Sequence, residues 1–358
     1  MTLGFVLMGC GRIAHRHASL LSQGQIEGAR LVAVCDPQGT RAADFGEKYG
    51  IPHFKTLEEL MSVHQEEVDV ISILTESGNH AANTREAVQW KKHIIVEKPM
   101  ALTLEDADDM IRVCDQAGVR LFVVKQNRFN RPVVAVREAF EQGKFGKITM
   151  GTVRVRWSRP QEYYDQDAWR GTWAMDGGVF ANQASHHVDL LRYFLGDPVS
   201  VFARTKTALA DIECEDTGVA IVEFASGALG VIEATTATRP VDLEGSLSLL
   251  GASGTAVISG FAVNKLETFR FVGEEPMSDE QFAEISDNPP NVYGFGHKAY
   301  YESVVAALGS AGPALVDGLE GRRSLELVLA IYESAATGEI VQMRYKQRNA
   351  LLGRGRQG

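Results

Sequence analysis

A lysine stands at the end of a short apolar run, in the segment Ile94-Ile95-Val96-Glu97-Lys98-Pro99-Met100. The run predicts a buried strand, and open parallel sheets bind ligands beyond the carboxyl ends of their strands. The proline biases Lys98 towards an extended backbone, which presents its ammonium from a defined position. Lys98 is therefore a candidate catalyst, and Glu97 and Lys98 are candidate cofactor contacts. An isolated Glu-Lys-Pro would instead predict an exposed strand-end salt bridge.

A second group of reactive side chains lies in the middle of the chain, where Asn182 begins a predicted helix that ends at Gly196. Asn182, His186 and Asp189 are spaced four and three residues apart, so they share one helix face. Because the pKa of histidine lies near neutrality, His186 is a candidate general base; a lone histidine on such a face is more often a core residue. His187 points elsewhere and is predicted to be structural. The spacing of zinc or iron ligands is absent, so we expect no metal site.

A glycine motif follows the first predicted strand, Leu3 to Met8, and reads Gly9-Cys10-Gly11-Arg12-Ile13-Ala14. This is the G-x-G-x-x-A form of the dinucleotide fingerprint, in which the glycines allow a tight turn and close approach of a pyrophosphate to a helix N-terminus. A second strand ends at Asp36, at the offset of the carboxylate that binds a ribose hydroxyl. We expect Gly9, Gly11, Arg12, Ile13 and Asp36 to bind the cofactor. Asp36 would repel a 2′-phosphate, and the next basic residue is Arg41, so NAD is favoured over NADP.

Polar residues follow two further strands of the same predicted sheet. Thr75, Ser77 and His80 come after the strand that ends at Leu74, and Gln126 follows the strand Leu121 to Val124. Since parallel strands present their carboxyl ends at one edge, we expect these side chains to line the cofactor crevice. Serine and threonine are also common in any turn.

These residues require a doubly wound parallel sheet, because strands and helices alternate over residues 1–125. Residues 126–345 change character: sequential strands with short connections predict an α+β domain with a large open, mainly antiparallel sheet. Helices are expected at Gly296–Leu308 and Leu325–Thr337. Residues 346–358 form a basic, glycine-containing tail. We therefore expect two domains, a Rossmann domain for the cofactor and a domain for substrate binding and oligomerisation.

Composition excludes several classes of protein. The 358 residues carry a net charge of -10, and 45% are hydrophobic, which is typical of a globular protein and does not provide the basic surface that nucleic acids or anionic membranes require. No apolar run of 18 residues or signal-peptide pattern occurs, so we expect a cytoplasmic protein. The four cysteines lack C-x-x-C spacing and predict neither disulfides nor zinc binding.

Together, the glycine motif, Glu97-Lys98-Pro99 and the segment from Gly177 to Asp189 resemble the glucose-fructose oxidoreductase and inositol dehydrogenase (Gfo/Idh/MocA) family over about residues 1–345. Further segments are similar to bacterial UDP-N-acetylglucosaminuronate 3-dehydrogenases, which act in making lipopolysaccharide sugars. These segments share polar and aromatic residues, and they include Lys125-Gln126-Asn127-Arg128, Arg159-Pro160-Gln161-Glu162-Tyr163-Tyr164, Trp169-Arg170-Gly171-Thr172-Trp173 and Tyr293-Gly294-Phe295-Gly296-His297.

The resemblance implies that Lys98 and His186 handle the proton of the reacting hydroxyl, and that Trp169 and Arg170 contact NAD. Substrate contacts are expected from cationic, amide, aromatic and histidine side chains, namely Lys98, Arg159, Tyr163, Asn182, Gln183, His186 and His297. Many family members have Asp where this chain has Asn182, and an amide cannot carry a proton. Asn182 is therefore expected to orient other groups. The two strand arginines Arg154 and Arg156 are expected on a solvated sheet face.

The predicted activity is removal of hydride from C3 of UDP-N-acetylglucosaminuronate to NAD, which yields a 3-keto sugar nucleotide. Either His186 or a desolvated, neutral Lys98 could be the base. Three alternatives remain open: oxidation of a free sugar or inositol, an NAD-dependent glycosidase with transient C3 oxidation, and a cofactor-binding regulator without catalysis. The open sheet offers a face for self-association, so we expect a homo-oligomer, either a dimer or a tetramer.

Overall fold

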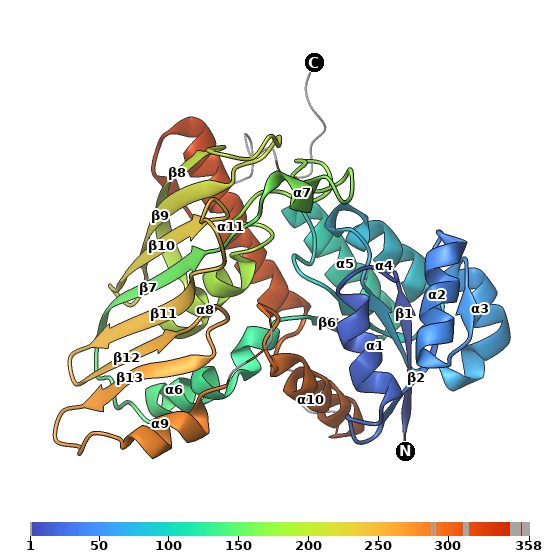
Figure 1. Ribbon diagram of the computed structural model, residues 1–358, viewed down its shortest axis with the longest axis horizontal. Helices are drawn as coiled ribbons and strands as arrows, with labels where there is room; N and C mark the ends of the chain where they lie inside the picture. The colour runs from blue at the N-terminus through green and yellow to red at the C-terminus, as the bar shows by residue number, and fades with distance from the viewer. Residues whose placement is uncertain (1, 288, 290, 311–314, 344–351, 353–358) are drawn as a thin grey trace. The chain divides into compact units, whose positions relative to one another are not determined.

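The computed structural model describes residues 2–287, 289, 291–310, 315–343 and 352. They form two compact units (Figure 1). The N-terminal unit comprises Met1–Val124 and His297–Arg323, and the C-terminal unit comprises Lys125–Gly296 and Ser324–Gly358. The predicted division after residue 125 lies next to the observed one, but residues 297–323, which the prediction assigned to the second domain, belong to the N-terminal unit. Most of the predicted tail, 346–358, lies outside the described residues.

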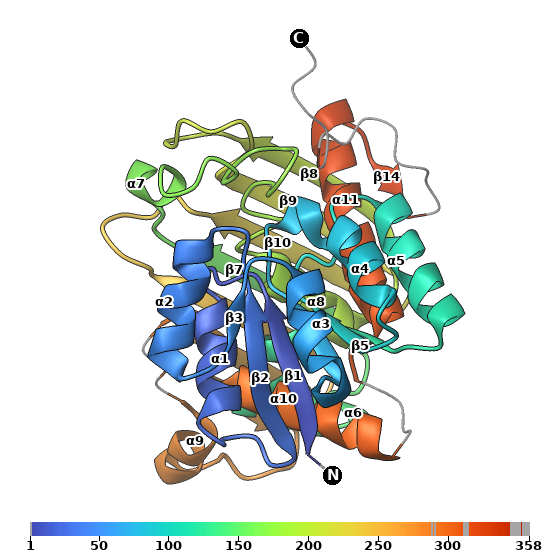
Figure 2. The same cartoon turned by 90° about the vertical axis from the view of Figure 1, so that its right-hand side faces the viewer.

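The N-terminal unit contains a six-stranded parallel sheet in the order β3-β2-β1-β4-β5-β6. Its strands are β1 (Leu3–Met8), β2 (Ala29–Cys35), β3 (His53–Phe54), β4 (Val70–Ile73), β5 (His93–Val96) and β6 (Leu121–Val123). The strand order reverses at β1, so right-handed crossovers put helices on both faces, as Figure 2 shows. The helices are α1 (Ala14–Ser22), α2 (Gly39–Tyr49), α3 (Leu57–His64), α4 (His80–Val88), α5 (Leu104–Ala117) and most of α10 (Gly296–Ser310). The predicted doubly wound sheet is confirmed.

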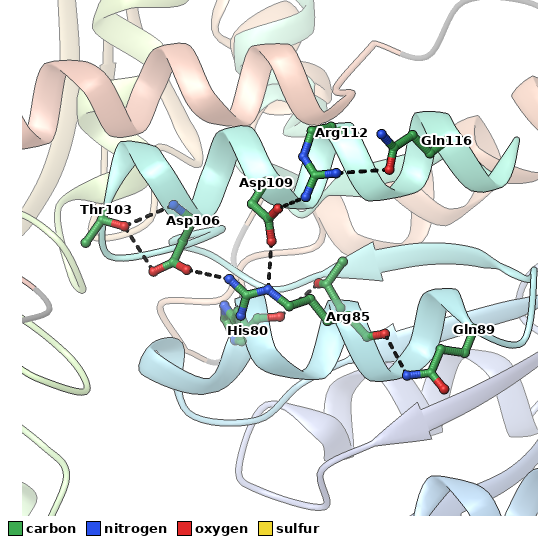
Figure 3. Close-up of polar contacts among 9 residues, drawn as sticks. His80, Arg85, Gln89, Thr103, Asp106, Asp109, Arg112 and Gln116 are labelled. Atoms are coloured by element: carbon green, nitrogen blue, oxygen red, sulfur yellow. Dashed lines mark hydrogen bonds and ion pairs between the residues drawn. The ribbon is translucent and has the colours of Figure 1, made fainter.

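Helices α4 and α5 pack side by side, and polar side chains join them on the surface (Figure 3). Arg85 of α4 donates to Asp106 at 2.9 Å and to Asp109 at 2.7 Å, both in α5. Thr103 caps α5 by accepting the N–H of Asp106 at 3.1 Å. These ion pairs are solvent-exposed, so each contributes little to stability. The packing depends mainly on the buried faces of the two helices.

The C-terminal unit contains an eight-stranded sheet in the order β13-β12-β11-β7-β10-β9-β8-β14. Its strands are β7 (Ile148–Arg156), β8 (Pro198–Lys206), β9 (Thr217–Phe224), β10 (Leu229–Thr235), β11 (Glu244–Gly251), β12 (Gly254–Ser259), β13 (Lys265–Phe271) and β14 (Val341–Gln342). All neighbouring strands are antiparallel except β7 and β10, which are parallel. The predicted α+β domain with a mainly antiparallel sheet is confirmed.

One face of this sheet is covered and the other is open. Buried and exposed residues alternate along β8, β9 and β10, as expected when only one face packs on a core. Figure 1 shows α8 (Ser185–Leu195) and the later part of α11 (Gly318–Thr337) on the covered side. The remaining helices are α6 (Arg131–Glu141), α7 (Gln161–Tyr164) and α9 (Asp279–Ile285). No helix among the described residues is long and apolar enough to cross a membrane.

Candidate active site

The glycine motif forms a turn between β1 and α1. Gly9 has a φ of +102°, and a Cβ atom there would lie 2.9 Å from the backbone of Leu74, so only glycine fits. A Cβ atom on Gly11 would meet nothing within 4 Å, which leaves open space beside the backbone. Helix α1 begins after Ile13 without a side-chain cap, so the amides of its first turn can bind a ligand. Arg12 is exposed next to them. This arrangement fits a pyrophosphate.

Asp36 lies at the end of β2, beside this turn, and is 5% exposed. One carboxylate oxygen accepts the N–H of Cys10 at 2.9 Å, and the other accepts the N–H of Gln38 at 2.8 Å. The two bonds fix the carboxylate, while each oxygen retains a lone pair for a further donor. Asp36 is thus arranged to accept a hydrogen bond from a ribose hydroxyl.

His80, a predicted cofactor contact, lies inside the N-terminal unit and is 1% exposed. Its ring nitrogens lie 2.8 Å from the Pro99 carbonyl oxygen and 3.1 Å from the Thr75 carbonyl oxygen. Burial lowers the pKa of His80, and a neutral ring can donate to only one carbonyl at a time. The Thr75 hydroxyl donates to Asn83 at 2.7 Å, and Ser77 is 8% exposed. His80 therefore links the segment after β4 to the segment that carries Lys98.

Glu97 and Lys98 follow β5 directly and have different environments. Glu97 is 6% exposed; one carboxylate oxygen lies 3.0 Å from His17 Nε2, and the other accepts the Lys98 N–H at 3.0 Å. Burial alone would raise the pKa of Glu97, but the hydrogen bond and charge of His17, with smaller contributions from His297 and Lys98, lower it to about 2. Because Glu97 is engaged internally, it supports the segment of Lys98 instead of reaching a ligand. Lys98 is partly exposed.

His297 was a predicted substrate contact, but the structure places its ring in the N-terminal unit with no exposed surface. The ring meets His17 edge to face at 5.4 Å. Burial and the charge of His17 lower the pKa of His297 to about 3. Since a ring without exposed surface does not reach a substrate, we omit His297 from the proposed substrate site.

His17, Glu97 and His297 are groups of the kind that bind metals, and their ligand atoms lie within 4.8 Å of one another. Glu97 is already bonded to His17, and His17 Nδ1 lies 2.6 Å from the Tyr301 hydroxyl. The positive charges of Arg16 and Lys98 also act on His297 and would oppose a cation. We therefore interpret His17 and Glu97 as a hydrogen-bonded support for Lys98, with His297 packed against His17.

Helix α8 begins at Ser185, later than predicted, so Asn182 lies in the turn before it. The Asn182 side-chain amide donates to Asp176, which fits an orienting role. His186, in the first turn of α8, is 7% exposed, and Gln183 is 6% exposed. The predicted helix face shared by Asn182 and His186 is therefore incorrect, because the helix starts between them.

Asp189, which was expected to share a helix face with the candidate base His186, is engaged in buried hydrogen bonds and ion pairs instead. It is 1% exposed and accepts two bonds from Arg128, at 2.8 Å and 2.7 Å, and one from the Ser324 hydroxyl. Burial would raise the pKa of Asp189, but the charges of Arg128 and Lys125 lower it to about 2. This residue anchors α8. His187 is fully buried against Trp157, and burial lowers its pKa to about 4, in agreement with the predicted structural role.

The predicted substrate contacts Arg159 and Tyr163 lie together with the predicted NAD contacts Trp169 and Arg170. The Arg170 guanidinium lies 4.8 Å from the ring centre of Tyr163 and 4.6 Å from that of Trp169, and it donates to the Tyr163 hydroxyl at 3.0 Å. Arg159 lies 5.5 Å from the ring centre of Tyr163 and donates to Asp242. Such a stacked cluster can bind anionic or planar groups. Gln126, the last predicted cofactor contact, is 3% exposed.

His17 was not identified from the sequence, although its ring holds the Glu97 carboxylate beside Lys98. His17 lies on the buried face of α1 together with Ala14, Ala18 and Leu21. His17 is a polar residue at the helical spacing of these apolar residues, and this pattern could have identified it in the sequence.

Two family models match the chain. Residues 3–125 match an oxidoreductase family with an NAD-binding Rossmann fold, and residues 133–257 match the GFO/IDH/MocA C-terminal domain. Among curated proteins, myo-inositol 2-dehydrogenase of Thermotoga maritima is 29% identical over 344 residues, covering 92% of this chain and 95% of that protein.

Two solved structures are more similar. The WlbA dehydrogenase of Bordetella pertussis, in complex with NADH and UDP-GlcNAcA, is 42% identical with a TM-score of 0.89, covering 96% of this chain and 99% of that one. The Chromobacterium violaceum WlbA dehydrogenase, in complex with the same two molecules, is 40% identical with a TM-score of 0.87, covering 95% and 96%.

Proposed function

Because the chain belongs to the Gfo/Idh/MocA oxidoreductase family and carries its NAD-binding Rossmann domain, we propose that it oxidises the C3 hydroxyl of UDP-N-acetylglucosaminuronate. The observation that carries this proposal is the identity of 40–42%, over nearly the full length, with two dehydrogenases bound to NADH and UDP-GlcNAcA. The product would be a 3-keto sugar nucleotide for lipopolysaccharide synthesis, as the resemblance implies, and we place the reaction in the cytoplasm.

The open space beside Gly11, the uncapped start of α1 and the fixed carboxylate of Asp36 fit NAD. Asp36 would disfavour NADP because its charge repels a 2′-phosphate. When bound, NAD+ accepts the hydride that leaves C3. The protein must hold the sugar, remove the hydroxyl proton and exclude competing reactions.

We assign proton handling to Lys98 and His186. His186 would take the hydroxyl proton while the C3–O single bond becomes a carbonyl, and the Lys98 ammonium would stabilise the negative charge that develops on that oxygen. In the reverse assignment, a neutral Lys98 acts as the base. The cluster of Arg159, Tyr163, Trp169 and Arg170 would hold the anionic and planar groups of the nucleotides, and Asn182 would orient the sugar.

The test is nicotinamide absorbance after mixing the protein and NAD+ with UDP-N-acetylglucosaminuronate, UDP-N-acetylglucosamine or myo-inositol. We expect reduction of NAD+ with the first substrate. Myo-inositol is included because the relative from Thermotoga maritima is named as a myo-inositol 2-dehydrogenase. Turnover of myo-inositol, without turnover of the uronate, would replace the proposal by oxidation of a free polyol.

Substitution tests the two assigned residues. Lys98→Met and His186→Asn should each lower kcat by roughly 10²–10⁴-fold, the contribution of a general acid or base. NAD binding, measured by titration of NADH fluorescence, should change little. A variant that keeps wild-type kcat would remove its residue from the mechanism.

We also propose a homo-oligomer, a dimer or a tetramer, that pairs through the open face of the eight-stranded sheet. This face carries both arginines and glutamates: Arg156 donates to Glu233 at 2.6 Å and to Glu244 at 3.1 Å. A two-fold axis brings the same surface against itself, so a face that carries both charges can complement itself. The occupant we propose is a second copy of the chain.

A further inference from the structure

Four consecutive backbone N–H groups precede α8. Their acceptors are the Tyr332 hydroxyl, one carboxyl oxygen of Glu215 and the main-chain oxygen of Glu215. Gly178 and Ala181 donate to the Tyr332 hydroxyl at 3.2 Å and 3.1 Å. Phe180 donates to a Glu215 carboxyl oxygen at 3.0 Å, and Val179 donates to the Glu215 main-chain oxygen at 3.0 Å. The turn 178–181 is therefore held by two residues from distant parts of the chain.

Tyr332 and Glu215 also bind each other. The Tyr332 hydroxyl accepts two N–H groups, so its own proton points to Glu215, whose Oε1 accepts it at 2.9 Å. Both side chains are 3% exposed. Since this pair supplies the acceptors for a buried turn, loss of either member would leave buried donors without partners.

The structure explains the second glycine of the Gly177-Gly178 pair. A Cβ atom on Gly178 would lie 2.0 Å from Glu215 Oε2 and 2.2 Å from Glu215 Cδ. The space that a side chain would occupy is filled by the carboxyl group. The glycine and the buried acid are therefore parts of one packing arrangement.

The second carboxyl oxygen, Oε2, is buried and has no hydrogen-bond partner among the described residues. The titratable groups acting on Glu215 are Tyr332, Asp176 and Cys214. Burial raises the pKa values of Tyr332 and Cys214, which keeps both neutral, and Asp176 adds a repulsive acidic neighbour. This environment favours a neutral carboxylic acid at position 215, because an anion would leave a charged oxygen buried and unsatisfied.

The turn leads directly into α8. Asn182 donates its N–H to the Gly178 carbonyl at 3.0 Å, and Ala184 donates to the Val179 carbonyl at 2.7 Å. Helix α8 then begins at Ser185, and His186 is its second residue. We propose that Glu215 is a positioning residue whose protonated carboxyl group holds this turn and, through it, His186. The inference rests on the proposed function, which makes His186 a proton-handling group.

This arrangement predicts a loss of stability as the pH rises from 4.5 to about 7. Burial raises the pKa of Glu215 to about 7 from the usual 4.5, although the hydrogen bonds from Phe180 and Tyr332 act to lower it. A raised pKa in the folded state stabilises the protein fully below pH 4.5, and this contribution is lost as the pH rises through about 7. The carboxylate that forms leaves the charged oxygen Oε2 buried without a partner, and this destabilises the folded arrangement around the turn.

The test compares the wild type with Glu215→Gln, which keeps the shape and one acceptor oxygen but cannot ionise. Urea unfolding is measured from pH 5 to pH 9. The unfolding equilibrium constant of the wild type should rise, relative to the variant, on the order of 10²-fold across this range. Glu138→Gln, an exposed change on α6, is the matched control and should follow the wild type.

The effect of Glu215 on the position of His186 is measured by enzyme turnover. As pH rises above 7, kcat of the wild type should fall, whereas KM for NAD should stay constant; Glu215→Gln should lack this alkaline loss. Glu215→Ala removes the acceptor at every pH and should lower kcat throughout. If Glu215→Ala does not fold, the glutamine variant still decides the question.

The same pH slope of unfolding in the wild type and Glu215→Gln would overturn the inference. So would a Glu215 carboxyl carbon that titrates near pH 4.5 in the ¹³C NMR spectrum. Neither measurement requires a substrate. Absence of turnover with all three substrates would instead overturn the proposed function, so the two failures are distinguishable.

Discussion

At the residue scale, His80 is the brace between two segments of the proposed site. Its ring faces the carbonyl oxygens of Thr75 and Pro99, and the latter follows Lys98 directly. His80→Ala would leave a buried carbonyl without its donor, which costs about 1–3 kcal/mol, and would release the Lys98 segment. We expect lower stability in urea unfolding and lower kcat. His80→Asn, which keeps one donor, should restore part of both.

The exposed Glu86→Ala change on the same helix, α4, serves as the control for His80. It should alter neither unfolding nor kcat. If His80→Ala also left kcat at the wild-type level, His80 would be a packing residue without influence on Lys98.

The two glycines of the nucleotide motif should respond differently to alanine. Gly9→Ala places a Cβ atom against Leu74 at positive φ, so it should lower both stability and NAD affinity. Gly11→Ala meets no protein atom within 4 Å, so stability should remain while NAD affinity falls. Calorimetric titration with NAD+, together with thermal unfolding, separates the two effects. Gly309→Ala, which also meets no atom, is the control. Unchanged NAD affinity in Gly11→Ala would place the pyrophosphate elsewhere.

Sequence reasoning located residues whose signal is local. Asp36 and Lys98 follow apolar strands, and the glycine motif is contiguous, so their positions in the sheet could be predicted. His17 and Glu215 could not be assigned, because His17 meets Glu97 across 80 residues and Glu215 meets Tyr332 across 117 residues. Buried pairing of this kind depends on tertiary packing: the helical spacing in α1 can mark His17 as buried but does not reveal its partner, and no local pattern marks Glu215.

At the element scale, α8 is anchored by the buried pair of Asp189 and Arg128. Asp189→Asn should lower the free energy of unfolding by about 3–5 kcal/mol at pH 7, because it leaves the Arg128 charge buried and uncompensated. The folded pKa of Asp189 is lowered to about 2 from 3.8. Its contribution is therefore present above pH 3.8 and lost as the pH falls through 2, so the variant should show a weaker acid dependence in denaturant unfolding.

Glu302→Gln is the control, since Glu302 forms an exposed ion pair with Lys298, 3.8 Å away, on α10. An exposed pair is worth 0–1 kcal/mol, so this variant should unfold almost like the wild type. Equal effects of the two changes would show that the buried pair does not anchor the helix.

Elements with a clear periodic pattern were predicted, and others were missed for physical reasons. Helix α9 buries no residue, so its sequence lacks an apolar stripe; its capping box, Ser278 with Gln281, was the available signal. The start of α8 was placed too early because the turn before it is held by Glu215 and Tyr332, which are distant in sequence. Strand β13 pairs with β12 through a register shift, which interrupts the alternation that identifies a strand.

At the scale of the whole molecule, residues 297–323 return to the N-terminal unit after the C-terminal sheet is complete. Tyr301 of α10 packs edge to face on Phe5 of β1 at 5.5 Å and lies 2.6 Å from His17. The support of Lys98 thus includes residues from both ends of the chain. Sequence order gave no indication of this return, because a helix after a sheet is equally compatible with either unit.

The proposed oligomer pairs through the open face of the eight-stranded sheet. Phe202, Ile221 and Val231 lie beside one another on β8, β9 and β10, and Ile221 is 55% exposed. Beside this apolar row, the ion pairs of Arg156 with Glu233 and Glu244 provide groups of positive and negative charge. A face of this kind suits an isologous interface, because the apolar row can bury itself against its copy while the charges complement each other.

Ile221→Arg would place a charge in the centre of that interface, where it would be buried and unpaired. Light scattering should therefore give an oligomer for the wild type and a monomer for the variant. Val63→Arg is the matched control, since Val63 is 64% exposed on α3, which belongs to the N-terminal unit, and should keep the wild-type mass. A monomeric wild type, or an Ile221→Arg variant of unchanged mass, would contradict association through this face. NADH binding to the monomeric variant should persist, because the glycine motif and Asp36 belong to the N-terminal unit.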